Sequence, residues 1–157
     1  MLEGRSNSEL AIELVNAGMR LPLVHALTGL CSSRLRNLYK SVNGNSAPPG
    51  RTPEYAHLLI KNREQALEAA KFIIHYNLIS KERGNGSSGC RVVDPEVLLK
   101  AYEFYEQITK APLNINLACY IMRDLGSGRL TTRRCAKCGI LYAFSHANEA
   151  MQTCPMC

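Results

Sequence analysis

Apolar side chains recur every three or four residues through most of residues 1–128, which is the spacing of amphipathic helices. Ser8 and Ser32 stand at the start of two such stretches and are the expected N-caps, and Gly18 follows the first stretch as a stop. Proline in the first turn of the stretch between them is typical of a short helix. The predicted helices of this N-terminal part are 8–17, 22–28 and 32–42.

Two segments rich in glycine, proline and serine interrupt the helical pattern and predict linkers over 43–53 and 84–93. The first ends in Thr52 and Pro53, which resemble the cap and first residue of a long helix. Further helices are predicted from Thr52 to about 77, from Asp94 to Pro112, and over 113–125. After residue 128 short strands and turns replace the helical spacing, and 141–146 is an expected strand.

Two Cys-x-x-Cys pairs lie in this last part of the chain: Cys135 with Cys138, and Cys154 with Cys157. Each pair aims two sulfurs at one point, and two pairs at this separation suit a tetrahedral metal site. Four thiolates leave no open coordination position, so we expect one structural zinc ion per chain. An iron–thiolate centre like that of rubredoxin is the alternative, because tetrahedral sulfur ligation does not by itself select zinc.

Three further cysteines lie outside these pairs. We expect Cys31 and Cys119 to be small buried side chains, and Cys90 to be a loop thiol. The total of seven is odd and no secretion signal accompanies it, which argues against a disulfide framework.

The predicted fold class is therefore mainly α. A helical domain, 1–128, carries a part resembling a helix-turn-helix over 20–42, and a small zinc-ribbon-like module follows over 129–157.

The helix-turn-helix is predicted because Gly29 suits the turn and Leu35 the packed inner face of the second helix. That helix would turn outward the residue types that contact base edges and phosphates. The candidate DNA contacts there are Arg34, Arg36, Asn37 and Lys40. A helical hairpin with a solvated basic face is the alternative interpretation.

The net charge of +6 over 157 residues favours a polyanionic partner, although many globular proteins are mildly basic. A second acid-free basic stretch adds three candidate DNA contacts: Arg133, Arg134 and Lys137. With 46% hydrophobic and 20% charged residues the chain is expected to fold. No apolar run approaches the roughly 18 residues that span a bilayer, and the N-terminus is not a secretory signal. We therefore expect a cytoplasmic protein without a membrane partner.

No catalytic pattern stands out in the sequence. His57 and His75 have no assignable acid–base partner, and the sequence shows no nucleophile–base order or glycine-rich phosphate loop. An enzyme is therefore not expected.

Several segments together resemble the FlhC family, the C subunit of the bacterial flagellar master activator. The segments are ELAIEL at 9–14, GMRL at 18–21, RLRNLYK at 34–40, APPG at 47–50 and the two closing cysteine pairs. The resemblance implies a transcriptional activator that pairs with a small helical D subunit in a complex of four D and two C chains. It also implies binding to promoters of flagellar genes, recruitment of RNA polymerase, and zinc ligation by the four paired cysteines.

The leading hypothesis is a DNA-binding activator subunit of flagellar genes, stabilised by zinc and dependent on a D-type partner. The first alternative is a zinc-stabilised interaction adaptor, in which the partner alone contacts DNA. The second alternative is an iron–thiolate redox protein, which its visible absorption would distinguish from a zinc protein.

Overall fold

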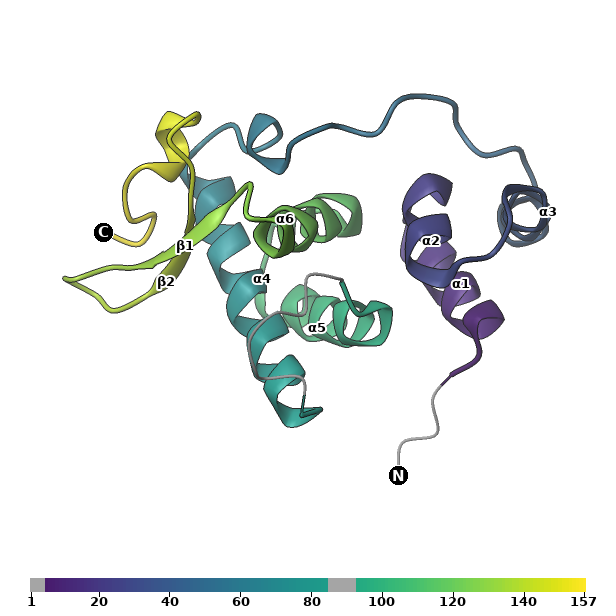
Figure 1. Cartoon of the computed structure of the whole chain (residues 1–157), viewed down its shortest axis with the longest axis horizontal. Helices are drawn as coiled ribbons and strands as arrows, with labels where there is room; N and C mark the ends of the chain where they lie inside the picture. The colour runs from purple at the N-terminus through teal and green to yellow at the C-terminus, as the bar shows by residue number, and fades with distance from the viewer. Residues whose placement is uncertain (1–4, 85–92) are drawn as a thin grey trace.

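The computed structural model describes residues 5–84 and 93–157 and is mainly α-helical, which confirms the predicted fold class. The N-terminal helices lie at one end of the molecule, the later helices in its middle, and the hairpin at the other end (Figure 1). Among the described residues, no helix is long and apolar enough to cross a membrane. The elements are α1 (Asn7–Asn16), α2 (Leu21–Thr28), α3 (Ser32–Asn43), η1 (Ala56–Leu58), α4 (Arg63–Glu82), α5 (Pro95–Ile108), α6 (Ile115–Ser127), β1 (Thr131–Arg134), β2 (Leu141–Phe144) and η2 (Glu149–Met151).

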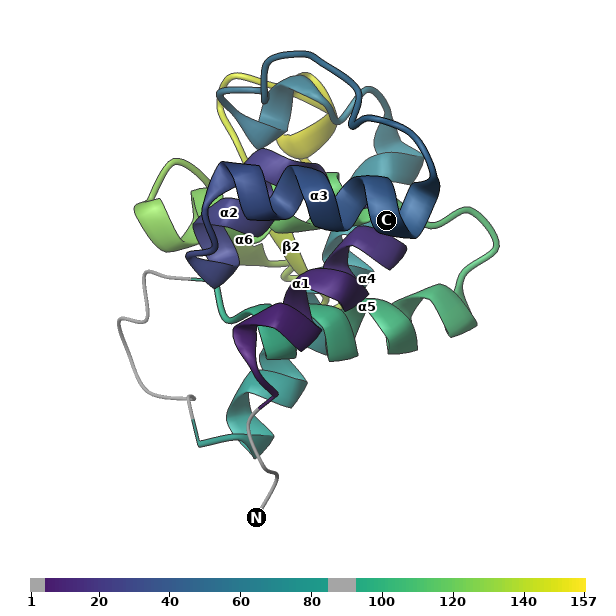
Figure 2. The same cartoon turned by 90° about the vertical axis from the view of Figure 1, so that its right-hand side faces the viewer.

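Helices α1, α2 and α3 pack against one another, and α3 lies along their outer side (Figure 2). The cap predicted at Ser8 is wrong, because α1 begins earlier. Ser6 accepts a hydrogen bond from the backbone N–H of Glu9, whose carboxylate bonds back to the N–H of Ser6. This reciprocal capping box satisfies two backbone donors that the helix itself leaves open.

Helix α3 covers the predicted range 32–42, but its N-cap differs from the predicted one. Cys31 is its N-cap and Ser32 its first helical residue, so the cap predicted at Ser32 is wrong. As a result Cys31 is exposed rather than buried. The inner face of α3 is as predicted, since Leu35 is buried.

Residues 44–55 form neither helix nor strand, and the helix expected to begin at Thr52 begins at Arg63 instead. Before that point, side chains from other segments bind backbone carbonyls: Arg20 donates to the carbonyl of Gly50, and Arg123 donates to that of Glu54. Asn62 then caps α4 by accepting a hydrogen bond from the N–H of Gln65. The second predicted linker, 84–93, lies almost entirely outside the described residues.

Helices α4, α5 and α6 bury an aromatic core. The ring of Phe72 on α4 contacts those of Tyr102 and Tyr105 on α5 edge-on, at centroid distances of 6.4 and 5.8 Å. Helix α5 begins at the predicted Asp94–Pro95, where the Asp94 carboxylate accepts from two backbone N–H groups. Asn114 caps α6 by accepting a single hydrogen bond, from the backbone N–H of Leu117.

The hairpin closes the other end of the molecule. Strands β1 and β2 are antiparallel, with Thr131 opposite Phe144 and Arg134 opposite Leu141. Strand β1 is exposed along its length, whereas β2 is mostly buried and packs on α4.

Candidate metal centre and nucleic-acid interface

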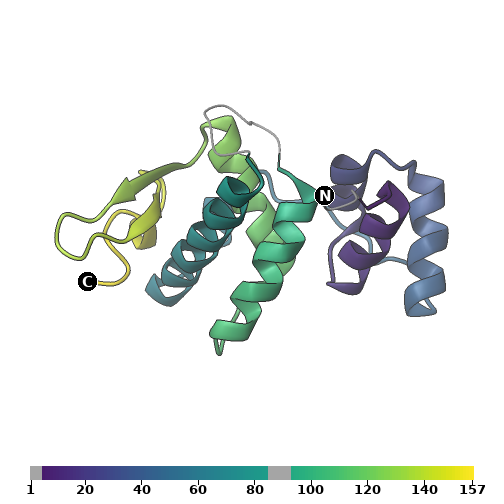
Figure 3. The same cartoon turned by 90° about the horizontal axis from the view of Figure 1, so that it is seen from below.

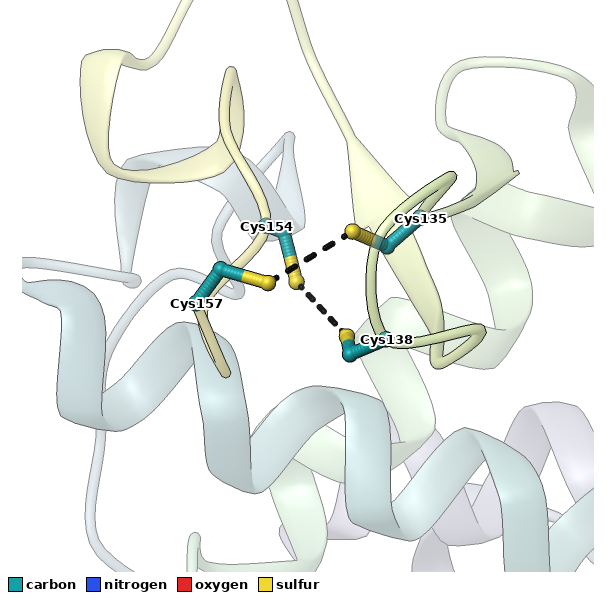
Figure 4. A group of neighbouring side chains, drawn as sticks. All are labelled: Cys135, Cys138, Cys154 and Cys157. Atoms are coloured by element: carbon teal, nitrogen blue, oxygen red, sulfur yellow. Dashed lines mark hydrogen bonds between the residues drawn. The ribbon is translucent and has the colours of Figure 1, made fainter.

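The first cysteine pair lies in the turn between β1 and β2. The N–H of Gly139 donates to the carbonyl of Cys135 at 2.9 Å, and the N–H of Cys135 donates to the carbonyl of Ile140 at 2.9 Å. Gly139 has a φ of 75°, a left-handed conformation that glycine adopts without steric cost. These bonds fold the turn so that Cys135 and Cys138 face the same side, towards the second pair (Figure 4).

The four paired sulfurs converge on one point, as the spacing predicts. All four lie within 4.8 Å of one another. The Sγ atoms of Cys135 and Cys157 are 3.7 Å apart, and those of Cys138 and Cys154 are 3.5 Å apart (Figure 4). Zinc–sulfur bonds of about 2.3 Å in a tetrahedron place the sulfurs about 3.8 Å apart, so the arrangement fits a four-thiolate metal ion.

Local electrostatics prepare one of these thiols for ligation. The backbone N–H groups of Cys138 and Lys137 face the sulfur of Cys135 and lower the pKa of its thiol to about 6. Without a metal ion, hydrogen bonding to Cys138, Cys135 and Cys154 raises the pKa of Cys157 to about 12. A bound divalent cation would favour the thiolate form of all four cysteines, because it binds thiolates and releases their protons.

The metal module rests on α4. Tyr142 and Phe144 of β2 form a small buried cluster with Ala70, and the half-buried Cys135 and Cys154 pack against it. At the helix start, Arg63 donates from Nε to the carbonyl of Pro155 at 3.0 Å, which fixes the second cysteine pair. The cysteine spacing alone carried no sign of Arg63 or Ala70, because helical side chains far away in sequence supply these contacts.

A third anchor is Asn148, which the sequence analysis also missed. Its amide donates to the carbonyls of His57 at 2.6 Å and Ile60 at 2.8 Å, tying the segment before the second cysteine pair to the turn before α4. Outside the pairs, Cys119 is buried as predicted, and burial raises the pKa of its thiol to about 12. Cys90 lies outside the described residues.

Where the helix-turn-helix is predicted, α2 and α3 are joined by the short segment 29–31. Gly29 is the C-cap of α2 with a φ of 73°, a left-handed conformation that glycine adopts more easily than other residues. His25 Nδ1 lies 2.7 Å from the carbonyl oxygen of Leu30 and holds the turn closed. Thr28 also accepts a hydrogen bond from the N–H of Leu30.

The outer face of α3 is polar and basic, and it carries no acidic residue. Asn37 and Lys40 are exposed on it, as expected of DNA contacts. Arg34 is exposed at its edge and donates to Ser8 Oγ on α1 at 3.0 Å. Arg36 is also exposed and lines a cavity of about 480 Å³ between α2, α3 and the proline-rich segment.

The second basic stretch lies on the hairpin. The guanidinium of Arg133 stacks over the ring of Phe144 at 3.4 Å, and Arg134 donates to the carbonyl of Gly139 at 2.8 Å. Both remain exposed, as does Lys137. Figure 3 shows β1 and α3 at opposite ends of the molecule, so the candidate DNA contacts form two separate surfaces.

Comparisons with known proteins identify the family. The profile of a family described as "Flagellar transcriptional activator (FlhC)" matches residues 1–157. The chain belongs to the FlhC family. The predicted family resemblance is therefore confirmed, and the family is one of flagellar transcription regulators.

Curated FlhC relatives match over most of their length. The flagellar transcriptional regulator FlhC of Paraburkholderia atlantica is 31% identical over 163 residues, covering 100% of this chain and 71% of the relative. That of Serratia marcescens is 30% identical, covering 95% of this chain and 76% of the relative. That of Sodalis glossinidius (strain morsitans) is 32% identical, covering 87% and 70%.

Proposed function

We propose that this FlhC chain is the DNA-binding subunit of an activator of flagellar genes. The observation that carries the proposal is the outer face of α3, the second helix of a helix-turn-helix, which presents Asn37 and Lys40 free of any acidic neighbour on that helix. An asparagine amide pairs with adenine edges in the major groove, and lysine neutralises phosphates. Arg34 and Arg36 flank this face and add positive charge.

The hairpin supplies the second part of the proposed DNA surface. Phosphates would be attracted there, at a distance from α3, by Arg133, Arg134 and Lys137. The base sequence of the promoter would then be recognised by few side chains, together with the energy needed to deform the duplex. In this proposal residues 1–128 form a helical domain and 129–157 a module. Zinc would act there as a structural tie between the two cysteine pairs, held by Cys135, Cys138, Cys154 and Cys157.

The proposed partners are those that the family resemblance implies. We propose that the chain works in the cytoplasm with a small helical D-type subunit, in a complex of four D and two C chains that recruits RNA polymerase to promoters. This role is regulatory rather than catalytic.

Titration of duplex DNA at several salt concentrations tests the proposal. The chain is measured alone and after co-expression with its D-type partner, on promoter DNA and on unrelated DNA of equal length. We expect the complex to bind promoter DNA more tightly than either chain alone, with an affinity that falls steeply with salt. Absence of binding by both preparations would overturn the proposal.

A second candidate, the interaction adaptor, is favoured by one observation. Phe104 and Ile108 lie one turn apart on α5 and are 49% and 60% exposed, beside the acidic Glu103 and Glu106. An exposed apolar pair with acidic neighbours suits a protein partner rather than DNA. Crosslinks to DNA from the partner but not from α3 or β1 would favour the adaptor.

A further inference from the structure

The four candidate metal ligands are not equivalent in exposure. Cys138 and Cys157 are exposed, whereas Cys135 and Cys154 are half-buried against the cluster on α4. Each exposed sulfur has a half-buried neighbour in the opposite pair: Cys157 lies 3.7 Å from Cys135, and Cys138 lies 3.5 Å from Cys154 (Figure 4). The close contacts therefore cross between the two Cys-x-x-Cys turns.

We propose that the centre is also a peroxide-sensitive thiol switch, in which oxidation releases the metal ion and joins Cys135 to Cys157 and Cys138 to Cys154. The proposal rests on the metal site described under the proposed function, because the released ion is the zinc of that site. It adds a chemical modification of the ligands and a specific pairing.

The reaction begins at an exposed sulfur. The thiolate of Cys138 or Cys157 attacks one oxygen of hydrogen peroxide, so that an S–O bond forms, the O–O bond breaks, and the leaving hydroxide takes up a proton to become water. The sulfur loses two electrons to the peroxide and becomes a sulfenic acid. Loss of this thiolate weakens the hold on the metal ion, since zinc binds deprotonated sulfur.

The half-buried neighbour then completes the step. Its thiolate attacks the sulfenic sulfur, an S–S bond forms, the S–O bond breaks, and the hydroxide leaves as a second water after protonation. Repetition at the other exposed sulfur consumes a second peroxide and makes the second disulfide. In total, four thiolates, two peroxides and four protons give two disulfides and four waters, and the zinc ion is released.

Two sulfur–sulfur contacts with hydrogen-bonding geometry favour one pairing out of three, within a cluster whose sulfurs all lie within 4.8 Å of one another. Four cysteines can pair in three ways, and a disulfide needs sulfurs about 2.0 Å apart. The two cross contacts, at 3.7 and 3.5 Å, need only a short approach of side chains that already face each other. The oxidised module keeps its two turns joined, while Arg63 still holds the carbonyl of Pro155. Reduction by a dithiol then restores the ligands in place.

The experiment uses the full chain, purified with zinc and carrying Cys31→Ser and Cys90→Ser, so that the buried Cys119 is the one thiol left beside the four paired cysteines. Hydrogen peroxide is added in the presence of a chromogenic zinc chelator, and the remaining thiols are alkylated. Cleavage after Lys137, Glu149 and Met156 then separates the four cysteines into different fragments. Mass spectrometry of the linked fragments gives the pairing directly.

We expect zinc release to rise together with two crossed disulfides, Cys135–Cys157 and Cys138–Cys154, and a dithiol with added zinc to reverse both. Pairing within each turn, or Cys135–Cys154 with Cys138–Cys157, overturns the inference. Zinc release with no disulfide also overturns it. A purified chain that contains no bound zinc overturns the metal site itself, so the two failures are distinguishable.

A matched variant tests the pairing independently. In Cys157→Ser, treated in the same way, we expect Cys138–Cys154 to form as before while Cys135 remains open to alkylation. A disulfide between Cys135 and Cys138 in this variant would show that nearness along the chain, and not the crossed contacts, decides the product.

Discussion

The carboxylate of Asp124 accepts a 2.6 Å hydrogen bond from the backbone N–H of Ala56, and both residues are fully buried. This bond fixes the segment before α4 against α6. Arg123 adds a hydrogen bond from Nε to the same carboxylate at 2.9 Å. The buried side chain of Asp124 is therefore one of the ties between the segment that follows the N-terminal helices and the rest of the molecule.

Asp124→Ala is expected to lower the free energy of unfolding by about 2–3 kcal/mol, because it leaves a buried N–H without an acceptor. Asp124→Asn keeps an oxygen at this place and should cost less. Urea unfolding followed by circular dichroism measures both. Equal losses in the two variants would show that the charge, rather than the acceptor, matters.

Asn116 joins the N-terminal helices to α6 by a second route. Its amide oxygen accepts from the N–H of Arg20 at 2.8 Å, and its amide nitrogen donates to the carbonyl of Gly18 at 3.1 Å. Asn116→Ala should cost about 1–2 kcal/mol and speed proteolytic cleavage within 44–55. Asn77→Ala, on α4, serves as the control. Unchanged cleavage in Asn116→Ala would contradict this docking role.

Stability should fall in acid partly through Glu68. Burial alone raises the pKa of this carboxyl, but hydrogen bonds from Lys71, Tyr105 and Thr109 outweigh it and hold the pKa below its ordinary value of 4.5. Because the folded pKa is the lower one, the contribution is complete above pH 4.5 and is lost as the pH falls through the folded value.

Glu68→Gln should remove this part of the acid dependence and also cost about 1–2 kcal/mol at neutral pH. Exposed Glu103→Gln is the matched control. Urea unfolding between about pH 3 and about pH 7 gives the free energy of unfolding of wild type and both variants. Parallel curves for wild type and Glu68→Gln would refute the assignment.

On the proposed DNA face of α3, Lys40 and Asn37 are expected to play different roles, one contacting phosphate and the other contacting a base. Lys40→Ala should weaken binding to all duplexes and reduce the slope of log affinity against log salt by about 1. Asn37→Ala should cost about 1–3 kcal/mol on promoter DNA with little effect on unrelated DNA. Lys100→Ala on the acidic α5 is the charge control. Equal effects of Lys40→Ala and Lys100→Ala would remove α3 from the interface.

Removal of one metal ligand should release the ion and loosen the hairpin. In Cys138→Ser we expect zinc content to fall to background and the C-terminal segment to become sensitive to protease, while α1–α3 stay helical. Cys31→Ser should retain zinc. Elemental analysis with limited proteolysis checks both variants, and full zinc content in Cys138→Ser would count against the four-cysteine site.

Much of the fold and of the metal site could be predicted because local spacing determines it. The helical periodicity located α5, where Asp94 and Pro95 mark the start, and two Cys-x-x-Cys pairs were enough to bring four sulfurs together. The outward position of Asn37 and Lys40 also followed from helical spacing around the buried Leu35.

The remaining features depend on contacts between distant segments. Thr52 and Pro53 have the local signature of a helix start. Arg20 and Arg123, however, donate hydrogen bonds to the backbone carbonyls of Arg51 and Pro53, and the helix begins only after its cap at Asn62. A competing local motif explains the error at Ser8: Ser6 has a glutamate three residues later and Ser8 does not.

Helix α4 lies between the hairpin on one side and α5 and α6 on the other (Figures 1 and 3). Ala70 contacts β2, and Phe72, two residues later on the same helix, contacts the aromatic rings of α5. The two halves of the molecule are thus coupled thermodynamically through one shared backbone. Metal binding by the four paired cysteines should therefore slow hydrogen exchange at backbone amides of α5, although α5 does not contact the ion. Heating should give a single calorimetric transition in place of two.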